Sequence, residues 1–208
     1  MDGVFMKKIW KRILLCACIT GCIWTWGLIT DRQNLRDEIL RLHVVADSDS
    51  AEDQAIKLRV RDAVLESISQ DLAQITDPEQ ARIYIRENLP KIESAANDCL
   101  EALGCGDTAV ATLQEELFDT RVYDTFSMPA GIYEALKITI GSGQGKNWWC
   151  VAFPTLCVPT TAEGFEEAAV SAGFSESLTE TLEGEYEIRF YLLDLLGRLE
   201  GILWKRGN

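Results

Sequence analysis

The chain has 208 residues, of which 47% are hydrophobic and 25% charged, a composition typical of a globular protein rather than a disordered one. Its formal net charge is −13, and that charge is divided unevenly along the sequence. Residues 1–30 hold four basic side chains and one acidic one, which leaves 16 basic and 32 acidic side chains in the remainder. A body with this excess of acid repels phosphate backbones and anionic lipid, so we expect no nucleic-acid partner.

The first 30 residues have the pattern of a segment that directs export. Four basic residues precede an uncharged run at 13–30, and they are Lys7, Lys8, Lys11 and Arg12. A basic stretch followed by an apolar one is typical of secretory signals and membrane anchors, and as a helix this run extends about 27 Å, just enough to cross a bilayer. A buried core helix would give the basic flank no role. We therefore predict a signal peptide or membrane anchor at 1–30 and an extracytoplasmic domain at 31–208.

The apolar run also contains a short match to the lipobox of bacterial lipoproteins. In Ile19-Thr20-Gly21-Cys22, the thiol of Cys22 would receive the lipid before cleavage. The residues after Cys22 stay apolar, whereas a lipoprotein chain usually turns polar there. Lipidation of Cys22 is therefore an alternative beside simple cleavage and retention as an anchor.

The body is predicted to begin with a strand and a helix. Apolar and polar residues alternate up to Val45, which is typical of a strand with one buried face. Ser50 is a favourable helix N-cap, and apolar residues then recur every fourth position from Ile56 to Leu72. On this spacing, Lys57 and Arg59 fall on the other faces of the helix.

A second helix is predicted to begin at Asp77, with Pro78 in the first turn, where a proline forfeits no hydrogen bond. Within it, we expect Pro90 to break or restart the helix with Asn88 as the new cap, because proline lacks the N–H that the helix needs. Gly104 is predicted to end it.

Three further strands are predicted at 109–123, 132–140 and 148–153, followed by helices at 163–171 and 188–202. Strands that are adjacent in sequence favour antiparallel pairing. The order of elements therefore predicts an α+β domain, with an antiparallel sheet of about four strands and amphipathic helices packed on one face.

Glycines at 141, 143 and 145 lie between two predicted strands. A phosphate-binding loop would need a helix directly after them, or a Gly-Lys-Ser/Thr sequence, and neither is present. A hairpin loop whose glycines adopt positive φ is the better interpretation.

Four cysteines lie in the predicted exported body: Cys99, Cys105, Cys150 and Cys157. An even number in an extracytoplasmic domain suggests disulfides, and the short separation of Cys150 and Cys157 makes that pair our preferred bridge. Their spacing does not match common zinc sites, and we expect no metal and no cofactor.

The chain has a single histidine, His43, so any Ser or Cys hydrolase would have to use it as the base. Cys150 and His43 are the candidate pair for an exported thiol hydrolase. Cys150 follows two tryptophans in an apolar strand, where desolvation disfavours the thiolate. We therefore favour an exposed His43 at the strand end, in contact with a partner or the neighbouring acids.

Two long motifs resemble the stage II sporulation protein R family. The first is Leu42-His43-Val44-Val45-Ala46-Asp47-Ser48-Asp49-Ser50, and the second runs from Ile140-Gly141-Ser142-Gly143-Gln144-Gly145-Lys146-Asn147 to Trp148-Trp149-Cys150-Val151. The sequence departs from the family at Asp47, where Asn is usual, and at Thr155, where a second proline is common.

The resemblance implies a signalling protein rather than an enzyme. Members of this family are exported from the forespore toward the septal space, where they activate a membrane-embedded aspartic protease of the mother cell that matures a sigma-factor precursor. Two loops are our candidates for the contact, with Asp47 and Asp49 beside His43 at one and Lys146, Asn147 and Trp148 at the other. Trp148 and Trp149 should face opposite sides of their strand. A cell-envelope scaffold is a third alternative.

Overall fold

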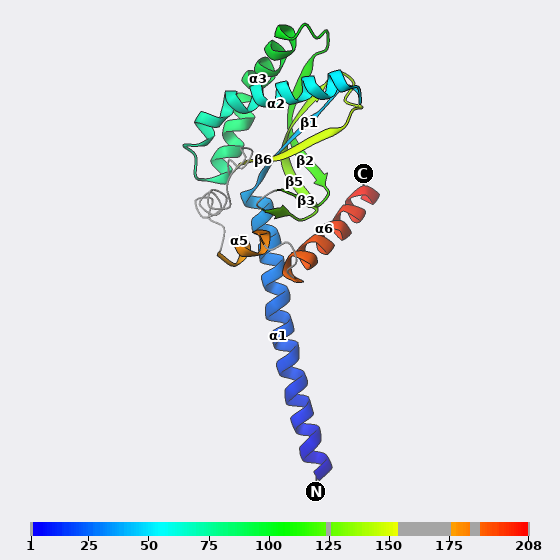
Figure 1. Ribbon diagram of the computed structural model, residues 1–208. Coiled ribbons are helices and arrows are strands. Elements are labelled where there is room, and N and C mark those ends of the chain that lie inside the picture. The colour runs from blue at the N-terminus through cyan, green and yellow to red at the C-terminus, as the bar shows by residue number, and fades with distance from the viewer. Residues whose placement is uncertain (1, 124–125, 154–175, 184–187, 208) are drawn as a thin grey trace.

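The computed structural model describes residues 2–123, 126–153, 176–183 and 188–207. A folded body lies at one end of a long helix, α1 (Asp2–Glu38) (Figure 1). The helix is long and apolar enough to cross a membrane, and the side chains of its apolar run are exposed up to Trp26, whereas Leu28 is buried against the body. The helix continues unbroken through Cys22. This continuity does not distinguish cleavage of the segment, its retention as an anchor and lipidation of Cys22, so all three stay predictions.

The body contains a four-stranded sheet in the order β2-β5-β1-β6, which confirms the predicted α+β class. The strands are β1 (Leu40–Val45), β2 (Ala109–Phe118), β5 (Gly131–Ile140) and β6 (Asn147–Phe153). β2 pairs with β5 and β1 pairs with β6 in antiparallel fashion. β1 and β5 are parallel, which departs from the expected antiparallel pairing, because two helices and three strands separate them in sequence and the chain crosses over between them.

One face of the sheet is covered by α2 (Ala51–Leu72) and α3 (Pro78–Ala102). Ser50 caps α2 as predicted, since its hydroxyl accepts a hydrogen bond from the Asp53 N–H at 3.0 Å. Burial on α2 follows the predicted i+4 ridge from Val60 to Leu72, and these side chains form one core with the facing residues of β1 and β5.

The predicted break at Pro90 is wrong, because α3 runs continuously through it. Pro90 lies on an exposed side of the helix, where water can solvate the carbonyl that loses its N–H partner. The Asn88 side chain donates to the Tyr84 carbonyl at 2.8 Å instead of capping a new helix.

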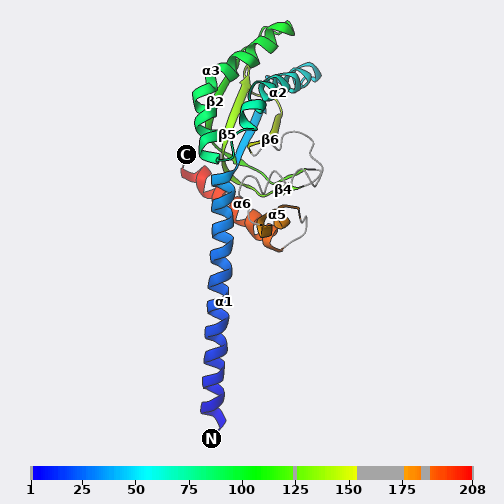
Figure 2. The same cartoon turned by 90° about the vertical axis from the view of Figure 1, so that its left-hand side faces the viewer.

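The opposite face of the sheet is covered by a second apolar cluster, to which the end of α1 contributes Leu35. Also on this side lie the hairpin of β3 (Arg121–Val122) and β4 (Ser127–Met128), with α5 (Glu176–Glu183) and α6 (Ile188–Gly207). The two views agree that α5 and α6 lie beside the part of α1 nearest the sheet (Figures 1 and 2). The predicted strand at 109–123 is therefore two strands, the terminal helix is confirmed, and the helix predicted at 163–171 lies outside the described residues.

Candidate functional site

The two predicted loops meet at one end of the sheet. Residues 46–50 follow β1 and residues 141–146 join β5 to β6, and backbone hydrogen bonds connect them. Gly145 N–H donates to the Ala46 carbonyl at 2.9 Å, and Gln144 N–H donates to the Asp47 carbonyl at 3.1 Å. Together with Asn147 and Trp148, these two segments are called the loop surface below.

Two carboxylates of the first loop hold the second. Asp47 Oδ1 accepts the Ser142 N–H at 2.6 Å, and Asp49 Oδ1 accepts the Lys146 N–H at 2.7 Å. Hydrogen bonding from the Ser142 backbone and hydroxyl lowers the pKa of Asp47. An amide oxygen could accept the same backbone bond, so the departure from Asn at Asp47 leaves this contact intact.

The predicted hairpin is wrong, because β1 lies between β5 and β6 in the sheet, but two of the three glycines adopt the predicted positive φ. Gly141 and Gly143 have φ of +54° and +64°, which side-chain-bearing residues rarely adopt. Gly145 has a different role: a Cβ there would lie 2.7 Å from the Ser48 carbonyl carbon and 2.9 Å from the Ala46 Cβ. Only a glycine therefore lets the two loops approach this closely.

Lys57 lies beneath both loops, although its spacing placed it on a polar face of α2. It is 5% exposed, and its ammonium donates to the Lys146 carbonyl at 3.0 Å and to Gln54 Oε1 at 2.7 Å. Burial lowers the pKa of Lys57. The available signal was that Lys57 lies three residues before Val60, on the buried side of α2.

Lys146 and Asn147 are among the residues whose side chains remain available at the loop surface. Both are exposed, and within the described part of the chain their side chains make no hydrogen bond or ion pair. Trp148 is half-buried against the helical core, with the Arg61 guanidinium carbon 4.6 Å from its ring centroid. Trp149 packs on the opposite face of the sheet, which confirms that the two tryptophans point in opposite directions.

His43 does not belong to this surface, and the expectation of an exposed histidine is wrong. It is 7% exposed, because its alternation in β1 points it into the second apolar cluster beside Phe118 and Trp149. Its Nδ1 is hydrogen-bonded to Glu116, not to the acids of the loop. Burial opposes ionisation of Glu116, yet hydrogen bonds from His43 and Lys137 lower its pKa to about 2.

The structure does not bring Cys150 to His43. In the β1–β6 register, Cys150 is opposite Leu42, whereas His43 is opposite Trp149. Cross-strand partners share a face, so the Cys150 sulfur and the imidazole lie on opposite faces of the sheet. Cys150 is disulfide-bonded and therefore has no thiol to act as a nucleophile. Cys157 lies outside the described residues, so its pairing with Cys150 stays a prediction.

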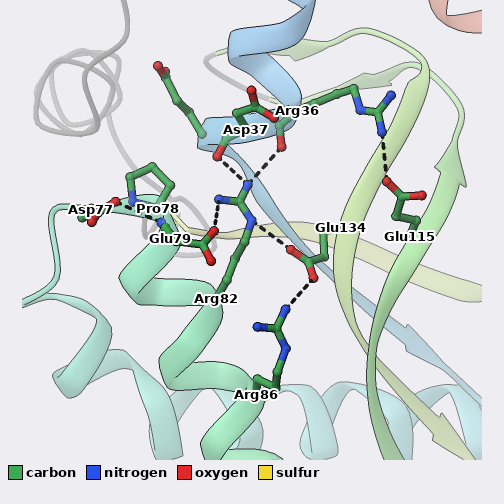
Figure 3. A pocket seen from close by; sticks show the side chains of 10 residues that line it. Arg36, Asp37, Asp77, Pro78, Glu79, Arg82, Arg86, Glu115 and Glu134 are labelled. Atoms are coloured by element: carbon green, nitrogen blue, oxygen red, sulfur yellow. Dashed lines mark hydrogen bonds and ion pairs between the residues drawn. The ribbon is translucent and has the colours of Figure 1, made fainter.

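A charged pocket of about 550 Å³ lies between the end of α1, the start of α3 and the edges of β2 and β5 (Figure 3). Arg82 lies at its centre, where it pairs with Glu134 at 2.8 Å and donates to the Arg36 carbonyl at 3.1 Å. Arg36 in turn pairs with Glu115 at 2.9 Å. In these contacts opposite charges pair with one another and connect α1 to the body. We therefore interpret the pocket as a structural junction.

The chain is thus a mixed α+β domain that follows a membrane-length helix and presents a loop surface built from two distant segments. Comparison with known proteins shows that it belongs to the stage II sporulation protein R family, whose model matches residues 36–163. A curated relative, stage II sporulation protein R of Bacillus subtilis (strain 168), is 42% identical over 121 residues. That match covers 58% of this chain and 54% of the relative, about half of its length. No solved structure matches the chain.

Proposed function

We propose that this protein is exported from the forespore to the septal intermembrane space and there activates a membrane-embedded aspartic protease of the mother cell. The protease would then mature the precursor of that cell's sigma factor. The observation that carries the proposal is that two segments of the family-matched region, 46–50 and 141–146, form one exposed surface. The membrane-length helix at the N-terminus supports export.

Activation by binding requires that the loop surface bind the active form of the protease more tightly than the inactive form. Lys146 and Asn147 are suited to this contact, because the loops are held by backbone atoms and by the carboxylates of Asp47 and Asp49. The side chains of Lys146 and Asn147 are therefore free to meet a partner without unfolding the loops.

The first experiment is reconstitution in a host that does not sporulate. This protein, the protease and the sigma-factor precursor are co-expressed, and the precursor is followed by its change in size. We expect processing with the full chain and none when residues 1–30 are deleted, because the body must leave the cytosol. Absence of processing by the full chain, with all three proteins present and folded, would contradict the proposal.

The loop surface is tested in the same assay with a double variant, Lys146→Ala with Asn147→Ala. We expect a loss of processing of at least about tenfold, the effect of removing roughly 1.4 kcal/mol of binding free energy. Lys91→Ala is the matched control, because Lys91 is an exposed lysine that pairs with Asp71, at the far end of α2 from the loops. Full processing by the double variant would exclude these two side chains from the contact.

A further inference from the structure

A fully buried guanidinium lies on the face of the sheet opposite α2 and α3. Arg41 is 0% exposed in β1. Its Nε donates to the Cys150 carbonyl and its Nη2 to the Tyr123 hydroxyl, both at 3.1 Å. Its Cζ lies 4.4 Å from the centroid of the Phe118 ring. Among the described residues no carboxylate pairs with it, which is unusual for a buried charge in an acidic protein.

Arg41 contributes one of three unpartnered nitrogen atoms that belong to residues of β1 and β3 in the described structure. The buried side-chain atoms that lack a hydrogen-bond partner in the described part of the chain include Arg41 Nη1, His43 Nε2 and Arg121 Nε. Arg121 lies on β3 with its Cζ 3.6 Å from the centroid of Trp149, and the His43 ring is 5.5 Å from the same indole. Arg41, His43 and Arg121 are called the basic cluster below.

His43 is held in a fixed orientation within the basic cluster. Glu116 accepts a hydrogen bond from Nδ1 of His43, and Lys137 forms an ion pair with Glu116 at 2.6 Å. With Nδ1 occupied in this way, Nε2 is the atom left for a further partner, and in the imidazolium form it is a donor. The cluster therefore presents unused nitrogen atoms from β1 and from the β3–β4 hairpin, between aromatic rings.

We propose that the basic cluster is a binding site for a carboxylate side chain, aspartate or glutamate, presented by the protein partner. The guanidinium of Arg41 and that of Arg121 would share the carboxylate, and His43 would complete the set of donors. Planar guanidinium and carboxylate groups match in geometry, and such pairs are strongest where water is excluded.

Two other anions fit the site less well. The remainder of the chain beyond residue 30 carries 32 acidic and 16 basic side chains, and this excess opposes a multiply charged phosphate more than a single carboxylate. A lipid headgroup lies too far away: the eight helical residues between the apolar run and Glu38 rise about 12 Å before β1 begins. A side chain on a protein partner is not restricted to the height of the lipid headgroups.

The site is closed in the structure, since Arg41 is 0% exposed and His43 is 7% exposed, and Arg121 is the most exposed member of the basic cluster. Its side chain is half-buried and packs on the face of Trp149. It extends from the short β3–β4 hairpin, which pairs through only two residues on each strand. For a carboxylate to enter, the Arg121 side chain would turn from Trp149 toward it while Arg41 stays fixed by Cys150 and Tyr123.

The test rests on the proposed function, so the reconstitution with unaltered protein comes first and decides that function by itself. The full chain in nanodiscs of zwitterionic lipid is then titrated with overlapping peptides from the extracytoplasmic segments of the protease. Each peptide is used in its natural form and with Asp and Glu changed to Asn and Gln. We expect one peptide to bind at least about tenfold more tightly in its acidic form.

Variants assign that binding to the basic cluster. Arg41→Met and Arg121→Met should each remove the preference for the acidic peptide and reduce processing in cells, whereas Arg59→Met, an exposed arginine on α2, should change neither. Because Arg41→Met alters the core, Arg121→Met is the decisive variant. Processing by the unaltered chain with no carboxylate-dependent peptide, full processing by Arg121→Met, or displacement of the peptide by inorganic phosphate at equal concentration would overturn the site and leave the proposed function standing.

Discussion

The loop surface and the basic cluster both include residues of β1 or of the loop that follows it, but they are built in opposite ways. At the loop surface, main-chain atoms and two carboxylates satisfy one another, and the side chains of Lys146 and Asn147 stay free in solvent. In the basic cluster the side chains are enclosed, and the unsatisfied atoms are buried nitrogens.

Because of this difference, a substitution reports on a different property in each region. A change at an exposed loop side chain removes a contact with a partner and leaves the fold intact, since that side chain holds nothing in place. A change in or around the basic cluster alters folding stability as well, because buried polar groups depend on their remaining partners. Stability and processing must therefore be measured together.

The largest effect is expected for Glu116→Gln, beside the basic cluster. It removes the only charge-balancing carboxylate that both His43 and Lys137 contact in the described structure, and we expect a loss of about 3 kcal/mol of unfolding free energy. Urea denaturation of the full chain in detergent would measure it. Glu115→Gln is the control, because the Glu115 side chain is 59% exposed, and an equal loss there would contradict the assignment.

The same residue predicts a pH dependence. The pKa of Glu116 falls from an ordinary 4.5 to about 2 on folding, so the unfolded chain binds more protons in this range. The stability that Glu116 contributes is complete above about pH 4.5 and is lost as the pH falls toward 2. Glu116→Gln should lack this component, and parallel pH profiles for the two proteins would refute it.

A smaller effect is expected where the two loops touch. Gly145→Ala places a methyl group against the Ser48 carbonyl, and we expect a loss of about 2 kcal/mol together with reduced processing, since the loops must separate. Gly106→Ala is the matched control, because a Cβ there meets nothing within 4 Å. Thermal unfolding measures both, and an unchanged melting temperature for Gly145→Ala would show that the loops adapt.

The smallest effect distinguishes the two chemical roles of Asp47. Asp47→Ala removes the acceptor for the Ser142 N–H and should lower the melting temperature slightly. Asp47→Asn keeps an oxygen in that position and should stay close to the unaltered protein in both stability and processing. A large loss of processing in Asp47→Asn alone would mean that the charge itself contacts the partner.

Local patterns in the sequence predicted the elements well where one cause dominates. The Ser50 cap, the ridge from Val60 to Leu72 and the positive φ of Gly141 and Gly143 each follow from short-range rules of capping, periodicity and backbone conformation. The hairpin failed and the meeting of the two loops could not be predicted, because both depend on β1 lying between β5 and β6 in the sheet. Lys57, Arg41 and the buried His43 were missed because their environment comes from strands and loops far away in sequence.

Helix α1 has a consequence for how the body is presented. It runs without interruption from the apolar segment to Glu38, and a single residue, Ile39, separates it from β1. Arg189 pairs with Asp31 at 2.6 Å and so holds α6 beside it. No flexible linker therefore separates the apolar segment from the sheet. If α1 stays uncleaved, the heading of the body relative to the bilayer is set, and its search for a partner is confined to lateral diffusion and rotation about the helix axis. Cleavage of α1 would replace that two-dimensional search with free diffusion and tumbling. Whether α1 is cleaved would therefore determine the rate at which the body meets its partner.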